Sequence, residues 1–152
     1  MASYVGTLSN RLYVDVTVRP GMGRGQKNAT GEPSVVGRAL VDTGAQMSAI
    51  CEDVARKLGL ISNVTEQIQG FGAEVAYFTR YWVNIDLLSN HISPDPSDLG
   101  RNVAVVASPA VDRVDRQSDM KTIALIGMDI LVRCQLYVDG LDQRYILSTI
   151  RR

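Results

Sequence analysis

The stretch that most constrains the fold of this chain runs from residue 39 to residue 45. Residues 39–41 form a short apolar run of the kind found in a buried strand. The run ends at Asp42, and an ionised carboxylate at the rim of a core is costly unless it has partners. Thr43 adds a hydroxyl that can bond locally, and Gly44 lets the chain turn tightly against another backbone. This stretch therefore predicts a strand that presents one carboxylate on a small, rigid loop.

The length and charge of the chain narrow the classes of protein to consider. A chain of 152 residues can bury a sizeable core, and we expect residues 1–152 to form a single domain. The composition, 45% hydrophobic and 21% charged, is typical of a globular protein in water. Sixteen basic and sixteen acidic residues cancel, so no net field favours nucleic acid or an anionic membrane. We expect neither as a partner.

Targeting, redox and metal signals are weak. No apolar run approaches the ~18 residues of a membrane span, and the first residues lack the basic and apolar regions of a signal peptide. Cys51 and Cys134 are too few for a disulfide scaffold and suit small buried thiols. We therefore expect a cytoplasmic protein. His91 has no second ligand near it at metal spacing, so neither a metal nor a cofactor is expected.

Most of the remaining pattern predicts β-structure. Alternating, β-branched segments predict three strands, at 12–18, 35–41 and 102–107, and an apolar run predicts a fourth, at 122–126. Two longer segments predict hairpins, at 64–88 and at 135–148, the latter with its turn at Asp139-Gly140. Gly-, Pro- and charge-rich segments predict loops at 20–34, 89–100 and 108–121.

One helix is predicted directly after the Asp42 loop, over residues 48–60. Ser48 is a candidate N-cap, and Gly59 is a candidate stop. Three apolar residues, Ile50, Val54 and Leu58, repeat at helical spacing and define one buried face. A second, short helix is expected after Gly127, with Asp129 as an acid favoured by the helix dipole and not as a catalytic residue.

The motif Asp42-Thr43-Gly44-Ala45 resembles the active-site loop of the aspartic proteases, in the retropepsin-like branch. A second segment, residues 125–131, resembles the later signature of that branch, an apolar pair, a glycine and another apolar pair. The resemblance implies a mostly-β, single-lobe closed barrel with one or two short helices. It also assigns positions: Leu125, Ile126 and Gly127 would support the loop from below, and Gly70, Phe71 and Gly72 would form the tip of a flap over the substrate.

The resemblance further implies an aspartic endopeptidase that acts on proteins or peptides. Such chemistry needs two carboxylates that share one proton, and this chain has one Asp-Thr-Gly. A second Asp42 must therefore come from a second copy, in a two-fold symmetric homodimer. Thr43 would brace the two loops, and Gly44 would face the substrate. An alternative is a catalytically silent module with this fold, used for dimerisation or peptide binding.

The chain departs at two places from the sequence pattern of the viral enzymes in the retropepsin-like branch. Gln46 and Met47 stand where many viral enzymes carry acids, and Met128 stands where many carry an arginine. These changes leave Asp42 in place, but they remove groups that form ion pairs near the substrate and the dimer interface in those enzymes.

Overall fold

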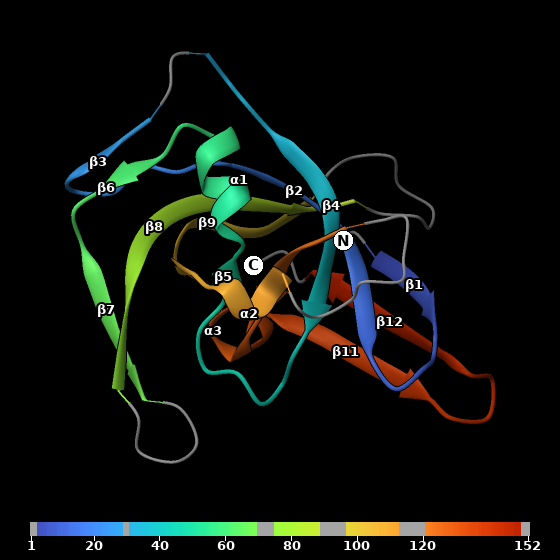
Figure 1. Ribbon diagram of the computed structural model, residues 1–152. Helices are drawn as coiled ribbons and strands as arrows, with labels where there is room; N and C mark the ends of the chain where they lie inside the picture. Colours follow the sequence, from blue (N-terminus) through green and yellow to red (C-terminus); the bar gives the residue numbers. More distant parts are fainter. Residues whose placement is uncertain (1–2, 29–30, 70–74, 89–96, 113–120, 150–152) are drawn as a thin grey trace.

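The computed structural model describes residues 3–28, 31–69, 75–88, 97–112 and 121–149 (Figure 1). Its strands are β1 (Ser3–Thr7), β2 (Leu12–Pro20), β3 (Gln26–Lys27), β4 (Val35–Val41), β5 (Ala49–Ile50), β6 (Ile61–Ser62), β7 (Thr65–Gln69), β8 (Val75–Leu87), β9 (Ser97–Ala107), β10 (Thr122–Ile126), β11 (Cys134–Asp139) and β12 (Arg144–Thr149). The helices of these residues are α1 (Glu52–Lys57), α2 (Pro109–Asp112) and α3 (Met128–Leu131). None of these helices is long and apolar enough to span a bilayer.

A closed barrel forms the body of the molecule. Its strands follow the order β2-β4-β10-β5-β9-β8, and pairing of β8 with β2 closes the ring. Alternation explains the core, because successive side chains of a strand point to opposite faces: in β2, Val14, Val16 and Val18 are fully buried. The sequence-based prediction of a mostly-β closed barrel is therefore confirmed.

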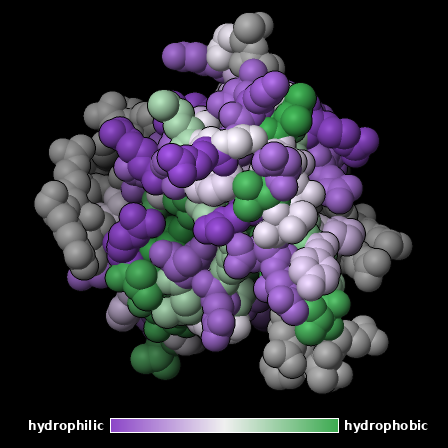
Figure 2. Space-filling model, turned by 90° about the vertical axis from the view of Figure 1, so that its left-hand side faces the viewer, coloured by the Kyte–Doolittle hydropathy of each residue, from purple (hydrophilic) through white to green (hydrophobic). Residues whose placement is uncertain are grey.

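Three smaller units extend the barrel (Figure 1). β7 pairs with the first half of β8 and makes a hairpin that projects from the ring. β3 and β6 form a two-stranded sheet beside it. The face that carries these strands is mostly hydrophilic, with apolar side chains scattered among polar ones (Figure 2). On the other side of the barrel, β1, β12 and β11 form a separate antiparallel sheet.

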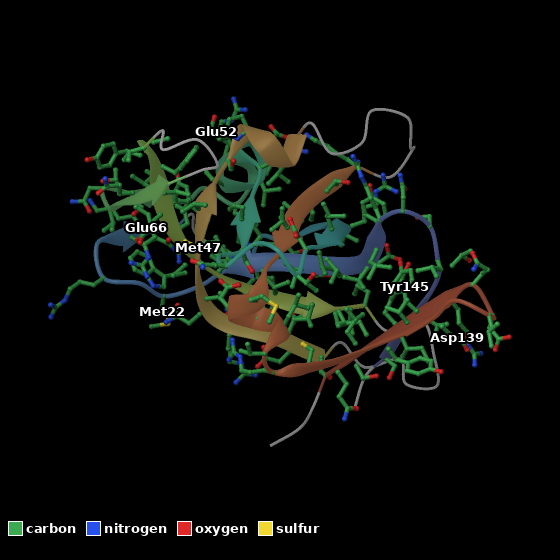
Figure 3. The ribbon with its side chains drawn as sticks, turned by 90° about the horizontal axis from the view of Figure 1, so that it is seen from below. Met22, Met47, Glu52, Glu66, Asp139 and Tyr145 are labelled. Carbon is green, nitrogen blue, oxygen red and sulfur yellow. The ribbon has the colours of Figure 1, made fainter. Side chains whose placement is uncertain are left out.

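Tyr145 fastens this three-stranded sheet to the barrel. It lies between β12 and the barrel strands (Figure 3), and its side chain is buried. Its hydroxyl donates to the carbonyl of Tyr13 and accepts from the Tyr13 N–H at 3.0 Å. Gly6 leaves room for the ring, because a Cβ there would lie 2.2 Å from it. The sheet therefore has one fixed position against β2.

The largest correction concerns the helix expected over residues 48–60. The structure has strand β5 at Ala49–Ile50, and α1 begins only at Glu52, with Cys51 at the N-cap. Ile50 is fully buried, and β5 pairs with both β10 and β9. Barrel closure thus overrides the helical spacing of the apolar residues. The stop is where it was predicted, since Gly59 has a φ of 64°.

The predicted loops need smaller corrections. The predicted loop 20–34 contains β3, α2 lies within the predicted loop 108–121, and β9 begins at Ser97 rather than at residue 102. The predicted strands 12–18, 35–41 and 122–126, the arms of both hairpins and the short helix after Gly127 are confirmed. His91 lies outside the described residues. Cys51 is fully buried, whereas Cys134 is only half-buried.

Candidate active site

Asp42 lies at the end of β4, where the pairing with β10 also ends. β4 and β10 run parallel, with Val41 beside Ile126. The Asp42 N–H then donates to the Ile126 carbonyl at 2.9 Å and continues the ladder by one bond. The backbone of Asp42 is therefore fixed by the core of the barrel, although its side chain is only half-buried.

The loop after β4 holds the Asp42 carboxylate from one side. The Gly44 N–H donates to Oδ1 of Asp42 at 2.9 Å, and the Ala45 N–H donates to the Asp42 carbonyl at 3.3 Å. A turn in which an Asp side chain accepts a hydrogen bond from the backbone N–H two residues later is an Asx turn. Thr43 and Gly44 are exposed at the tip. One oxygen of the carboxylate is oriented in this way, and the loop tip faces outward.

Gly127 supports the loop from below. β10 lies between β4 and β5, so the segment that joins these two strands must pass over the end of β10. A Cβ on Gly127 would lie 2.8 Å from the Ala45 carbonyl oxygen, a contact that only glycine avoids. The next residue, Met128, donates its N–H to the same oxygen at 2.7 Å. The structure thus brings together Asp42, Ala45, Ile126 and Gly127, whereas Leu125 pairs with Leu40 one step further from the loop.

Ser48 and Asp129 form a second brace that the sequence did not predict. The Ser48 hydroxyl donates to Oδ1 of Asp129 at 2.7 Å, and its N–H donates to Oδ2 at 3.0 Å. The same hydroxyl accepts from the Gly127 N–H at 2.9 Å. Ser48 is completely buried, and Oδ1 of Asp129 also accepts from the Ile130 N–H at 3.0 Å. The carboxylate therefore ties the end of the Asp42 loop to α3.

The chain resembles a known protein in its fold but matches no known family by sequence. No family model matches the chain, and a search of curated proteins finds no match. Among solved structures, the chain is similar to a retropepsin-like aspartic protease from Rickettsia conorii, with a TM-score of 0.54 and 16% sequence identity. The match covers 97% of this chain and 90% of that one. The chain has a retropepsin-like fold.

The segment predicted to form a flap lies within the β7–β8 hairpin. Its arms project at the same end of the molecule as the loop that follows β4 (Figure 1). The predicted tip, Gly70, Phe71 and Gly72, lies outside the described residues. Near the base of the hairpin, Arg80 of β8 donates to Glu66 of β7 at 3.1 Å.

A surface pocket of about 280 Å³ lies away from this loop, between α1 and the strands β8 and β9. Glu52, Arg56 and Tyr81 are among its lining residues. Burial raises the pKa of the Tyr81 hydroxyl, and the nearby Glu52 carboxylate adds to the shift. Among the described residues, none of those predicted for the site lines this pocket.

Proposed function

We propose that this protein is an aspartic endopeptidase whose active site forms when two copies each contribute Asp42. The observation that carries the proposal is the position of Asp42, at the end of β4 in a retropepsin-like fold, with its carboxylate oriented by the Gly44 N–H. Proteins and peptides would be its substrates.

The chemistry follows from two carboxylates at hydrogen-bond distance. Such a pair shares one proton because two like charges so close cannot both ionise, a case for which aspartic proteases are the standard example. The ionised carboxylate takes a proton from a water held between the two. The protonated one donates to the oxygen of the scissile carbonyl. The water attacks that carbonyl directly, so no covalent intermediate with the enzyme forms.

The same loop accounts for the requirement for a second copy. The sequence has one Asp-Thr-Gly, and Thr43 and Gly44 at the tip are exposed in the single chain. A two-fold axis beside this tip would place two identical loops against each other. The hydroxyl of Thr43 would then bond across to the partner's loop, and the carbonyl of Gly44 would face the peptide.

The flap would complete the site. A hairpin that closes over the peptide excludes water and strengthens the electrostatic interactions inside. Gly70 and Gly72 would give the tip its freedom to bend, and Phe71 would cover the substrate. These three roles come from the family resemblance and from the position of the β7–β8 arms.

Peptide cleavage with a matched pair of variants tests the proposal. The purified protein is incubated with a diverse peptide mixture from pH 4 to 7, and the fragments are read by mass spectrometry. We expect Asp42→Asn to lower cleavage by at least ~10²-fold, because a general acid–base contributes that much or more. Asp98→Asn, at an exposed acid of β9, should cleave like the wild type.

Two outcomes would contradict the proposal. Cleavage that survives in Asp42→Asn would point to another nucleophile or to a contaminant. Absence of cleavage by a wild-type protein that is shown to be dimeric would favour the alternative, a silent module that binds peptides or serves in dimerisation.

A further inference from the structure

The pocket between α1 and the strands β8 and β9 is lined in part by apolar side chains. Ala55 of α1, Leu60 after it and Ala107 at the end of β9 are each only 4–6% exposed. The pocket, of about 280 Å³, has room for one long side chain of another molecule. Its apolar lining suits the aliphatic part of such a ligand.

The polar part of the lining offers three oxygen-bearing side chains. Thr79 and Tyr81 lie two positions apart on β8, so both point to the same face of the strand. Glu52 lines the pocket from the first turn of α1. Among the residues that the structure describes, these three side chains form neither a hydrogen bond nor an ion pair. Their oxygen atoms are therefore available to a ligand.

The charge that acts inside the pocket is that of Glu52. Burial raises the pKa of the Tyr81 hydroxyl, the Glu52 carboxylate adds to the shift, and no cation opposes it. Arg56 also lines the pocket, but its side chain is 77% exposed and its guanidinium lies 3.7 Å from Asp53. The field at Tyr81 is therefore negative and favours a cation.

A primary ammonium group matches these features. It has three donors and no acceptor, and the pocket presents one carboxylate and two hydroxyls. The ring of Tyr81 adds a face on which a cation can bind. A guanidinium, with five donors in one plane, would leave donors unpaired here. A carboxylate or phosphate would be repelled by Glu52.

We propose that this pocket binds the ammonium group of a lysine side chain that belongs to a peptide. The aliphatic stem of the lysine lies along the apolar lining, and its ammonium group lies between Glu52, Thr79 and Tyr81. The choice of a peptide as the carrier of the lysine rests on the proposed function. The match between the pocket and an ammonium group does not.

The position of the pocket supports a peptide as the carrier. Thr79 and Tyr81 share one face of β8 with Val75, which lies further along the same arm of the hairpin. Glu52 lies in the same half of the molecule as Met47, at the end of the active-site loop (Figure 3). A peptide that lies under the hairpin can therefore extend into the pocket, with its lysine some residues away from the bond that is cut.

Calorimetric titration with a blocked amino acid tests the pocket without reference to activity. The ligand is N-acetyl-lysine N-methylamide, and the matching norleucine compound has the same stem without the ammonium group. We expect the lysine compound to bind with a Kd on the order of 1 mM, as is typical of so small a ligand. The norleucine compound should bind at least about fivefold more weakly, because it lacks the charge and the donors.

Variants of the lining separate a cationic ligand from an anionic one. Glu52→Gln should weaken binding of the lysine compound about fivefold or more, whereas Arg56→Gln should leave it unchanged or strengthen it. Tyr81→Phe keeps the ring and should weaken binding less than Glu52→Gln. Glu52 and Arg56 are exposed, so their substitution should leave the fold intact. Glu32→Gln, at an exposed position outside the pocket, should bind like the wild type.

The outcomes distinguish this pocket from the proposed function. Lysine binding that Glu52→Gln weakens supports the pocket even if no peptide is cleaved, in which case the proposed function fails by itself. Equal binding of the lysine and norleucine compounds, or an effect of Arg56→Gln in place of Glu52→Gln, overturns the pocket and leaves the function standing. Tighter binding of cadaverine than of the blocked lysine overturns the assignment to a peptide and indicates a free amine.

Discussion

At the scale of single residues, Ser48 shows how a side chain can be assigned the wrong partner from sequence. Its position before an apolar, helix-spaced run predicts an N-cap, yet Cys51 occupies that position. Ser48 instead bonds Asp129, 81 positions away along the chain. A helix cap needs only its neighbours, whereas this pair depends on closure of the barrel. No local signal could have joined the two.

Removal of the Asp129 carboxylate should destabilise the protein. Asp129→Ala leaves the buried Ser48 without its acceptors, and we expect a loss of about 2–4 kcal/mol in the free energy of unfolding. Asp129→Asn keeps one oxygen for the Ser48 N–H and should lose roughly half as much. Chemical denaturation measures both, with the exposed Asp142→Asn as the control. An Ala variant as stable as the wild type would show that the brace contributes nothing.

Asp15 makes stability depend on pH. Burial raises the pKa of its carboxyl, while a hydrogen bond from Tyr4 and the charge of Arg38 oppose the shift. Because the folded pKa lies above the unfolded value of about 3.9, the protonated form is favoured by folding. This contribution is present below the unfolded pKa and is lost as pH rises through the folded value.

Asp15→Asn should therefore be at least as stable as the wild type at pH 7, since Asn cannot ionise and still offers an oxygen to Tyr4. The difference should shrink at pH 4, because the wild-type carboxyl takes up protons as the pH falls toward the unfolded pKa of about 3.9. Denaturation curves at the two pH values check this. If the stability of the variant relative to the wild type is lower at pH 7 than at pH 4, the result contradicts this prediction.

At the scale of elements, the side chain of Gln26 bonds the backbone of β8 as a neighbouring strand would, and it helps to hold the segment after β2 against the barrel. Gln26 accepts from the Trp82 N–H at 2.7 Å and donates to the Trp82 carbonyl at 2.9 Å. The Trp82 ring packs against Gly23, where a Cβ would lie 2.1 Å from it. The glycine-rich composition predicts a loop here, and the amide of Gln26, together with the N–H groups of Gly21 and Met22, ties that loop to the barrel.

Gln26→Ala should cost about 1–3 kcal/mol in the free energy of unfolding, because it removes the partner of the Trp82 N–H, whereas the Trp82 carbonyl still accepts from the Gly21 N–H. Gln67→Ala, at an exposed position on β7, is the matched control and should change stability by less than about 0.5 kcal/mol. Equal effects of the two variants would mean that water replaces the Gln26 amide at little cost.

At the scale of the whole molecule, the proposed dimer predicts how wild-type and Asp42→Asn chains interact. When an equal amount of Asp42→Asn is added and the chains exchange, only a quarter of the dimers pair two intact chains, so activity should fall to about half. Unchanged activity would mean that each Asp42 works alone, and increased activity would mean that one carboxylate per dimer is enough. The rate of peptide cleavage measures this directly.

The sequence by itself determined the features that depend on neighbours along the chain. Alternation within β2 and β4 requires only that one face be buried, and the Asp42 turn closes through bonds to Gly44 and Ala45 next to it. The apolar pair and glycine that end β10 likewise marked the segment that lies under this loop. These local patterns were sufficient to predict the strands and the loop that presents one carboxylate, whereas the closed barrel was what the family resemblance implied.

Tertiary structure decided the features that need partners far along the chain. Ala49 and Ile50 form a strand because β9 and β10 flank them, although their spacing favours a helix. Asp129 braces the loop only once α3 lies beside Ser48. The free edge of β11 exists because β1 returns to pair with β12 and leaves β11 outside. In each case the free energy comes from pairing and burial between distant segments, which no short stretch of sequence contains.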